Sequence, residues 1–250
     1  MATYVSDQEL SIYIKKTNQI TLNGICSDFN VSVSTARRIL VRMEAQGLVH
    51  RYRGGAIPAP PKQTKYDMRL EKNAEAKDRI ARKAAESVAD GSNILLMGGT
   101  TIGKMCPYLH DKSIGVITNS LTVVEQLKDA PNIRLVMLGG IYNRDEAMFI
   151  NNVTSAGYRI IYADSLFISC RALSADVGYM TDNINAIDFY RLYMKNAGRT
   201  VVLADSTKFQ SSGIAIFASL NEVDCLITDA QLSEEDANVF AEHGVIVTIV

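Results

Sequence analysis

Hydrophobic residues near the start of the chain recur at helical spacing and predict two short helices. A helix that begins after Ser6 would carry Leu10 and Ile14 on one face. A second helix, LNGICSDF, would be capped by Thr21, because a threonine oxygen can accept the unpaired amides of the first turn. Just before it, Ile20 is expected to form a short strand that pairs with a later β-hairpin.

A third helix, between Val31 and Gly47, is expected to separate apolar from basic residues. Ser32 and Ser34 can each cap its start, and Gly47 can end it in the left-handed conformation. Its apolar stripe consists of Ala36, Leu40 and Met43. Its basic residues, which cannot share that stripe, are Arg37, Arg38 and Arg42. This arrangement suits a DNA-recognition helix, although a solvated amphipathic helix would show the same pattern.

A basic hairpin follows this helix. It contains the run His50-Arg51-Tyr52-Arg53 and the turn Gly54-Gly55. Positive charge beside a recognition helix favours contact with the phosphates of a duplex. The three helices and the hairpin together predict a winged helix-turn-helix of about 55 residues.

The remainder of the chain shows a different pattern, in which helical stretches alternate with short apolar runs. The stretch AIPAPPKQTKY separates the two regions and holds three of the five prolines within four positions, so it is expected to be a linker. Residues 74–89 form a helical stretch whose inner face would be Ile80, Ala84, Ala85 and Val88. The expected strands are residues 93–97, 115–118, 133–138, 165–169, 200–204, 224–228 and 245–250.

This alternation predicts an α/β domain with a largely parallel sheet. Several of the runs are hydrophobic throughout, as expected of strands that are covered on both faces. The sequence therefore predicts a winged helix-turn-helix at residues 1–57, a linker at 58–72 and an α/β sensor domain at 73–250.

The composition narrows the class of protein. A 47% hydrophobic and 21% charged chain is typical of a globular protein. No apolar run reaches the roughly 18–20 residues of a membrane helix, and MATYVSDQEL lacks the features of a signal peptide, so we expect a cytoplasmic protein with no membrane contact. The four cysteines and three histidines have no metal-ligand spacing. We expect no metal and no cofactor.

The charge is unevenly distributed. Residues 1–62 hold eight basic and four acidic residues, a net +4, whereas the whole chain carries −1. A polyanionic partner is therefore expected for the N-terminal region alone.

Four loops that follow predicted strands combine small residues with hydroxyls or a lysine. Ligands of parallel sheets bind at the carboxyl ends of the strands, where small residues let amides approach an anion. These loops are Gly98-Gly99-Thr100-Thr101, Thr118-Asn119-Ser120, Gly139-Gly140 and Asp205-Ser206-Thr207-Lys208. They predict a site for a phosphorylated or otherwise anionic small molecule. No G-x-S-x-G, Walker or H-E-x-x-H motif is present, so no catalytic residue is expected.

The pattern VS-x-x-T-x-RR-x-L-x-x-x-E-x-x-G-x-x-x-R-x-x-GGA at residues 31–56 resembles the DeoR family of bacterial transcriptional regulators, the group that contains the glycerol-3-phosphate repressor. The resemblance extends over essentially the full length. Further matching positions are Arg69, Asn73, Lys77, Ile80-Ala81, Gly91, Gly98, Thr100-Thr101, Thr118-Asn119-Ser120, Gly139-Gly140, Asp164, Gly178, Asp205, Lys208-Phe209 and Thr228-Asp229.

The resemblance implies a winged helix-turn-helix that binds operator DNA. It also implies a sensor domain similar in fold to ribose-5-phosphate isomerase, glucosamine-6-phosphate deaminase and CoA transferases, with a phosphorylated sugar as effector and a dimer or tetramer as the assembly. The expected DNA-binding residues are Ser34, Thr35, Arg37, Arg38, Arg42, Arg51 and Arg53. The expected effector-binding residues are Gly98, Gly99, Thr100, Thr101, Thr118, Asn119, Ser120, Gly139, Gly140, Arg171, Asp205 and Lys208.

The chain departs from the family pattern at several positions. The recognition helix has Ile39 in place of an aspartate and Ala36 in place of an isoleucine, so its preferred DNA sequence is expected to differ from that of relatives. In the sensor, the departures are Leu96, Gly99, Cys170-Arg171 and a glutamate missing near Ile187. Arg171 is therefore a candidate for effector specificity.

The sequence thus predicts a transcriptional repressor of a carbohydrate-metabolism operon that responds to a sugar phosphate and is not an enzyme. The alternative is a sugar-phosphate isomerase or deaminase with a DNA-binding appendage, which the implied fold permits. A scaffold that uses its first domain for protein contacts would leave the arginines of the hairpin unexplained.

Overall fold

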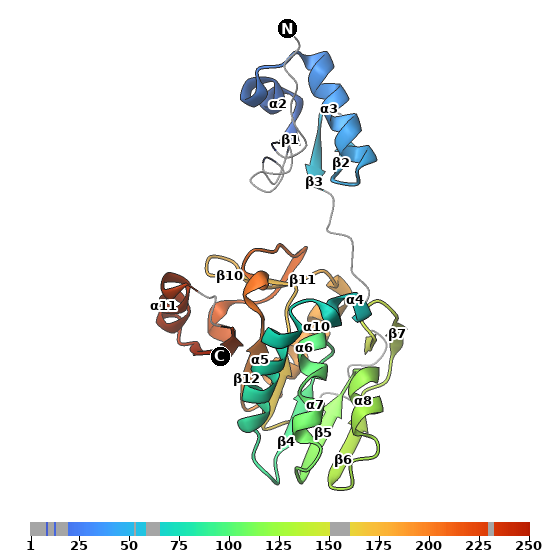
Figure 1. Cartoon of the computed structure of the whole chain (residues 1–250), viewed down its shortest axis with the longest axis vertical. Coiled ribbons are helices and arrows are strands. Elements are labelled where there is room, and N and C mark those ends of the chain that lie inside the picture. Colours follow the sequence, from blue (N-terminus) through green and yellow to red (C-terminus); the bar gives the residue numbers. More distant parts are fainter. Residues whose placement is uncertain are drawn as a thin grey trace. The chain divides into compact units, whose positions relative to one another are not determined.

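The computed structural model describes residues 9, 13, 20–52, 54–58, 66–150, 161–229 and 233–250. The chain divides into two compact units, residues 1–62 and 63–250 (Figure 1). Most of the first expected helix, with Leu10 and Ile14, lies outside the described residues, as do residues 59–65 of the expected linker. The domain limits at residues 57 and 73 stay predictions.

Among the residues that the structure describes, the first unit contains two helices and a three-stranded sheet. Its elements are β1 (Ile20–Thr21), α2 (Leu22–Phe29), α3 (Val33–Ala45), β2 (Val49–Tyr52) and β3 (Gly55–Pro58). The strand order is β1-β3-β2, and both pairs are antiparallel. Ile20 pairs with Ala56, which confirms the expected strand before the second helix. The core consists of Ile20, Ile25, Ala36, Ile39, Leu40, Met43, Val49 and Ala56.

The ends of α3 are formed by short polar and glycine residues. The Thr35 amide donates to Oγ of Ser32 at 3.3 Å, so Ser32, rather than Ser34, is the N-cap. Gly47 follows the helix at a φ of 70°, a left-handed conformation that glycine adopts without a Cβ clash. The helix boundaries expected from the sequence are therefore confirmed.

The second unit is built on a seven-stranded parallel sheet in the order β15-β14-β12-β9-β4-β5-β6. The strands are β4 (Asn93–Leu96), β5 (Ile114–Thr118), β6 (Ile133–Met137), β9 (Ser165–Ile168), β12 (Thr200–Leu203), β14 (Cys225–Thr228) and β15 (Ile246–Ile249). Each matches one of the seven apolar runs, and every pair is parallel. The predicted α/β class is confirmed.

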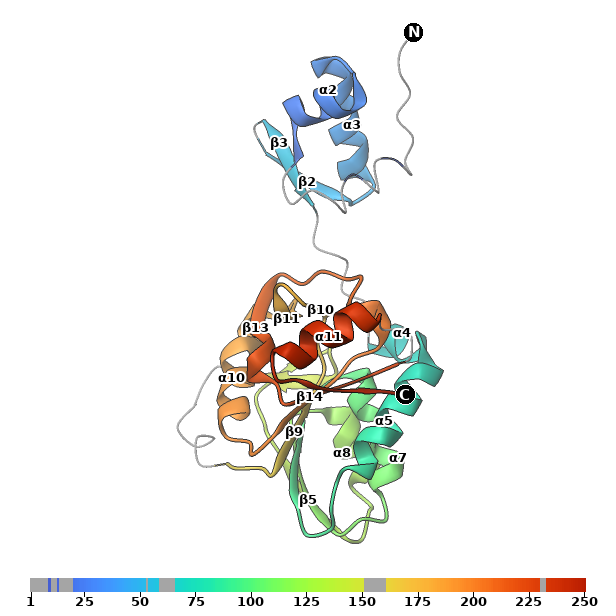
Figure 2. The ribbon, with the colours of Figure 1, turned by 90° about the vertical axis from the view of Figure 1, so that its left-hand side faces the viewer.

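Both faces of this sheet are covered, which explains its continuous apolar strands. Ile94 and Leu96 pack with the helices of one layer, whereas Leu95 and Met97 pack in the other. The first layer holds α5 (Ala74–Glu86), α6 (Thr100–Gly103), α7 (Cys106–Leu109) and α8 (Leu121–Leu127). The second holds α10 (Ile187–Lys195) and α11 (Glu234–Glu242) (Figure 2).

Several short elements were not expected from the sequence. An antiparallel sheet, β10-β11-β13, consists of Ala172–Ser174, Gly178–Thr181 and Ala215–Ala218. A hairpin pairs β7 (Ile141–Asn143) with β8 (Met148–Ile150). Three single turns of 3₁₀ helix are η1 (Ile184–Ala186), η2 (Ser206–Lys208) and η3 (Leu220–Glu222). These elements lie outside the alternation of helices and apolar runs from which the strands were predicted.

A further helix, α4 (Tyr66–Glu71), lies within the span predicted as linker. Its Tyr66 side chain is buried, and the Tyr66 hydroxyl lies so close to Gly103 that a Cβ there would approach it to 2.7 Å. The later part of that span therefore packs on the second unit. Across the described ranges, no helix has the length and apolar character needed to span a membrane.

Candidate functional site

The exposed side of α3 is basic. Arg37 and Arg38 are exposed, whereas Ala36, Leu40 and Met43 are buried, as the helical spacing predicts. Arg42, which the sequence groups with the exposed arginines, is only partly exposed. The helix therefore presents two exposed arginines, Arg37 and Arg38.

The start of α3 carries a cluster of hydroxyl groups. Oγ of Ser32 lies 2.9 Å from Oγ of Ser34 and 3.0 Å from Oγ1 of Thr35. Ser34 is exposed and Thr35 is partly exposed. These hydroxyls share hydrogen bonds with the cap, so the cap holds them at the end of the helix.

The hairpin is tied to the helix by an ion pair. Nε of Arg51 donates to Oε2 of Glu44 at 2.7 Å, and the Arg51 amide donates to Oε1 at 3.2 Å. The hydrogen bond from the Arg51 side chain lowers the pKa of Glu44. Arg51, expected to contact phosphate, is thus already paired within the domain. Arg53 lies outside the described residues.

Two departures from the family pattern lie inside the protein. Ile39 is 5% exposed and Ala36 is fully buried, and both belong to the core of the first unit. Their effect on the preferred DNA sequence stays a prediction. Leu96 is likewise fully buried under the helices that cover the sheet.

The second unit contains a pocket at the carboxyl ends of β4, β9 and β12, called here the carboxyl-end pocket. Its cavity volume is about 70 Å³, which is small beside the roughly 300–1,000 Å³ of typical small-molecule sites. It is lined by Arg69, Gly98, Gly99, Thr100, Thr101, Glu146, Ser169, Cys170, Arg171, Thr181, Asp182, Asn183, Tyr190 and Lys208. Six of the twelve expected effector residues line it, namely Gly98, Gly99, Thr100, Thr101, Arg171 and Lys208.

The loop from Gly98 to Thr101 leaves backbone donors available to a ligand. Gly99 stands at the N-cap position of α6 and provides no side-chain cap. By contrast, Ser120 caps α8 and Asp205 caps η2 with their own side chains. The Gly98 amide donates to Oδ1 of Asn119 at 2.9 Å, which fixes the start of the loop. Amides that no side chain caps at a helix start can bind an anion.

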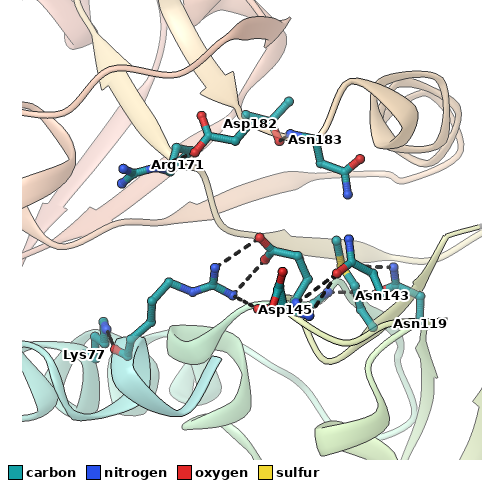
Figure 3. Close-up of polar contacts among 12 residues, drawn as sticks. Lys77, Asn119, Asn143, Asp145, Arg171, Asp182 and Asn183 are labelled. Atoms are coloured by element: carbon teal, nitrogen blue, oxygen red, sulfur yellow. Dashed lines mark hydrogen bonds and ion pairs between the residues drawn. The ribbon is translucent and has the colours of Figure 1, made fainter. Parts of the chain in front are cut away.

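Two arginine–carboxylate pairs line the pocket. Arg69, on α4, donates to Glu146 through both terminal nitrogens, at 3.1 and 2.8 Å. Nε of Arg171 donates to Oδ2 of Asp182 at 2.7 Å. In Figure 3, Arg171, Asp182 and Asn183 lie on one side of a gap, and Lys77, Asp145 and Asn143 lie on the other. The pocket therefore lies between two charged walls, one with the Arg171–Asp182 pair and the other with the Arg69–Glu146 pair.

Unlike Arg69 and Arg171, Lys208 is not paired with a carboxylate of any described residue. Within the described part of the chain, its ammonium group has no hydrogen-bond or ion-pair partner. Burial opposes ionisation of the neighbouring Asp205, but a hydrogen bond from Thr207 and the charge of Lys208 outweigh it, so the pKa of Asp205 is lowered. Lys208 thus brings an accessible positive charge to the pocket wall.

Lys77 lies behind the pocket rather than in it. It is 4% exposed, and its Nζ donates a hydrogen bond to the backbone oxygen of Arg69. Burial lowers the pKa of Lys77 from 10.5 to about 8, and the charge of Asp205 only partly offsets this effect. The side chain connects α5 to α4 just below the Arg69 guanidinium.

The other expected effector residues do not line the pocket. Oγ1 of Thr118 donates to the Leu96 oxygen at 2.6 Å and accepts from the Ser120 amide at 3.0 Å. Oδ1 of Asp205 accepts from Nδ2 of Asn73 at 2.9 Å. Thr118, Asn119, Ser120 and Asp205 are all buried, so they support the loops from behind.

Gly139 and Gly140 follow the edge strand β6 and also lie outside the pocket lining. The binding role of all twelve expected residues stays a prediction.

Eight lining residues were not expected from the sequence: Arg69, Glu146, Ser169, Cys170, Thr181, Asp182, Asn183 and Tyr190. Arg69 and Cys170 had appeared only as positions in the family pattern. Burial raises the pKa of the Cys170 thiol to about 12, so it stays neutral at physiological pH. Tyr190 lies on α10, and the others lie in short strands and turns that carry no motif.

Comparison with known proteins places these features in a family. Residues 7–60 match the DeoR-like helix-turn-helix domain, and residues 72–230 match the DeoR C terminal sensor domain. The HTH-type transcriptional repressor GlcR of Bacillus subtilis is 30% identical over 238 residues, which cover 93% of this chain and 91% of that protein. The lactose phosphotransferase system repressor of Lactococcus lactis is 31% identical over 240 residues, 93% of each chain.

Among solved structures, ribose 5 phosphate isomerase A from Neisseria gonorrhoeae aligns with a TM-score of 0.40 and 18% identity, over 54% of this chain and 53% of that chain. The two matched domains and the relatives that share nearly the full length show that the chain belongs to the DeoR family of DNA-binding transcriptional regulators.

Proposed function

We propose that this regulator represses a carbohydrate-metabolism operon, and that a phosphorylated sugar in the carboxyl-end pocket controls its affinity for operator DNA. The observation that carries the proposal is the unpaired ammonium of Lys208 beside the uncapped amides that follow Gly99. A phosphoryl group is an acceptor with up to two negative charges, so it matches a cation and backbone donors at once.

The exposed arginines of α3 support the DNA-binding part of the proposal. Arg37 and Arg38 would reach base edges or phosphates from the recognition helix, with Ser34 and Thr35 at its N-terminal end. Arg51 would contact phosphate with the guanidinium nitrogens that Glu44 does not hold. A homo-oligomer that acts in the cytoplasm would pair two such helices on an operator with two half-sites.

The position of α4 supports a coupling between ligand binding and DNA binding. Arg69 lines the pocket, and its helix is the first described element after β3 of the DNA-binding unit. A ligand that competes with Glu146 for Arg69 would change how α4 is held. Any such coupling is reciprocal, so operator DNA must alter effector affinity by the same factor.

The experiment begins by selecting a high-affinity duplex from a random library with the full-length protein. Binding of that duplex is then measured with and without each of a panel of sugar phosphates. One or more sugar phosphates are expected to weaken binding at least about tenfold, which corresponds to a coupling of about 1.4 kcal/mol. Lys208→Ala should bind the duplex normally and lose the response.

Lys128→Ala is the matched control, because Lys128 is exposed and lies outside the pocket lining. It should respond like the wild type. Equal duplex affinity at saturating concentrations of every sugar phosphate would contradict the effector part of the proposal, and failure to select any duplex would contradict the DNA-binding part.

We further propose that the protein is not an isomerase or deaminase. Glu146 and Asp182 line the pocket, and an arginine holds each of them. This pairing supports a binding role, because a carboxylate that transfers protons must be able to approach the substrate atom. Incubation with ribose 5-phosphate and glucosamine 6-phosphate should give no product, and turnover above background would contradict the proposal.

A further inference from the structure

We propose that Asp182 and Asn183 form a subsite that binds a hydroxyl group of the sugar, while Lys208 and the loop at Gly99 bind the phosphoryl group of the same ligand. The inference rests on the proposed function. It assigns a specificity role to two neighbouring residues in the turn between β11 and η1.

Within the part of the chain that the structure describes, each of these side chains has a buried polar atom without a hydrogen-bond partner. Asp182 is 7% exposed at its side chain, and Arg171 occupies its Oδ2, but Oδ1 is buried and accepts no hydrogen bond. Nδ2 of Asn183 is also buried and donates to nothing. Both residues line the carboxyl-end pocket.

Such unpaired atoms are costly, because a buried polar group that loses water without gaining a partner destabilises the fold. The turn itself is well formed, since the Asn183 amide donates to Oγ1 of Thr181 at 3.0 Å. The unsatisfied atoms therefore do not reflect a loose segment. In Figure 3, the side-chain amide of Asn183 projects into the gap between the two walls.

The two atoms have complementary chemistry. Oδ1 of Asp182 can only accept while the carboxyl group is ionised, and Nδ2 of Asn183 can only donate. A hydroxyl group donates one hydrogen and accepts another, so one hydroxyl can satisfy both atoms. A phosphoryl group can satisfy Asn183 but is repelled by Asp182, which orients the ligand with its phosphoryl end toward Lys208.

The test compares ligands that share a phosphate and differ in their hydroxyl groups. Affinities of the full-length protein for inorganic phosphate, glycerol 3-phosphate, ribose 5-phosphate, fructose 6-phosphate and glucose 6-phosphate are measured by calorimetry. At least one polyhydroxylated member is expected to bind about tenfold or more tightly than inorganic phosphate. In Asn183→Ala this advantage should be lost, while the affinity for inorganic phosphate stays unchanged.

Asn185→Ala is the matched control, because Asn185 is an exposed asparagine two residues further along that does not line the pocket. It should retain the advantage. Thermal unfolding without ligand separates a binding role from a structural one: Asn183→Ala removes an unpaired donor and should not lower the melting temperature.

The possible failures are distinct. If no member of the panel binds, inorganic phosphate included, the proposed function itself fails. If phosphates bind but sugars gain nothing over inorganic phosphate, or if Asn183→Ala keeps the full advantage, the hydroxyl subsite is overturned and the proposed function stands.

Discussion

The guanidinium group of Arg69 and the carboxylate of Glu146 face each other in a bidentate pair, with Nη1–Oε1 and Nη2–Oε2 separations of 3.1 and 2.8 Å. Nη2 of Arg69 also donates to the backbone oxygen of Asp145 at 3.1 Å. The pair joins α4 to the turn between β7 and β8, two elements 77 residues apart in sequence. Both side chains are about one-fifth exposed.

Loss of this pair is expected to destabilise the second unit. Glu146→Ala would leave the Arg69 charge largely buried without its carboxylate, which should lower the free energy of unfolding by about 1–3 kcal/mol. Hydrogen exchange of residues 66–71 should accelerate at the same time. Urea unfolding and exchange measured by mass spectrometry provide the two readouts.

Lys83→Ala serves as the control for that prediction, because Lys83 pairs with Glu86 on the exposed side of α5. Exposed pairs contribute little, so its effect should stay within about 0.5 kcal/mol. Equal effects of the two substitutions would show that the Arg69–Glu146 pair does not anchor α4.

Removal of either exposed arginine of α3 is expected to abolish specific DNA binding at moderate salt. Arg37→Ala and Arg38→Ala should each cost about 1–3 kcal/mol if the side chain contacts a base edge. A phosphate contact would instead weaken all sequences equally and reduce the salt dependence. Gel-shift titrations at several salt concentrations distinguish the two cases, and circular dichroism should show an intact fold. Unchanged affinity would remove the assignment.

Gly98 is expected to tolerate no side chain. A Cβ at this position would lie 2.5 Å from Sδ and 2.9 Å from Cβ of Met148. Gly98→Ala should therefore destabilise the protein by about 1–3 kcal/mol through overpacking. In a Met148→Gly background, which removes both of these atoms, the same substitution should cost much less. A double-mutant cycle by thermal unfolding measures this coupling, and additive effects would contradict the proposed steric conflict.

The buried amine of Lys77 predicts a rise in stability at alkaline pH. Below its folded pKa of about 8, the amine is protonated in both states, so the cost of burying the charge is fully present. Between about 8 and the unfolded value of 10.5, the unfolded chain holds the proton that the folded chain has lost. Stability should therefore increase with pH in this window, by at most about 1.4 kcal/mol per pH unit.

Lys77→Met isolates this contribution from the other groups that titrate in the same range. Urea unfolding from about pH 7 to about pH 10 should show a smaller rise for Lys77→Met than for the wild type. Lys83→Met, which changes an exposed lysine of the same helix, should retain the rise. A wild-type slope in Lys77→Met would contradict the buried-charge explanation.

Elements with a strong period could be predicted from the sequence. The run around Leu95 and Leu96 is apolar because the sheet buries both of its faces, and the stripe through Ala36 and Met43 lies on the core. Arg42 is only partly exposed, which the spacing could not show because it assigns a side of the helix and does not measure exposure. The strands β10, β11 and β13 were missed because they form an antiparallel sheet outside the alternation of helices and apolar runs on which the prediction rested.

The candidate site could be predicted only where its residues belong to a recognisable loop. Gly98 and Lys208 follow apolar strands, and parallel strands bring such loops to one edge. Asp205 follows a strand as well, but its side chain turns inward to accept a hydrogen bond from Asn73. The pairing of Arg69 with Glu146 depends on tertiary packing between distant segments, which no local pattern in one sequence reveals.

The two walls of the carboxyl-end pocket belong to different kinds of segment. One wall includes the turn with Asp182 and Asn183, which connects β11 of the small antiparallel sheet to η1 within the second unit. The other includes Arg69 on α4, close in sequence to the wing. Replacement of the β11–η1 turn by another sequence should therefore change the ligand to which the regulator responds and leave its DNA-binding unit unchanged. This turn is the natural starting point for building biosensors from the protein.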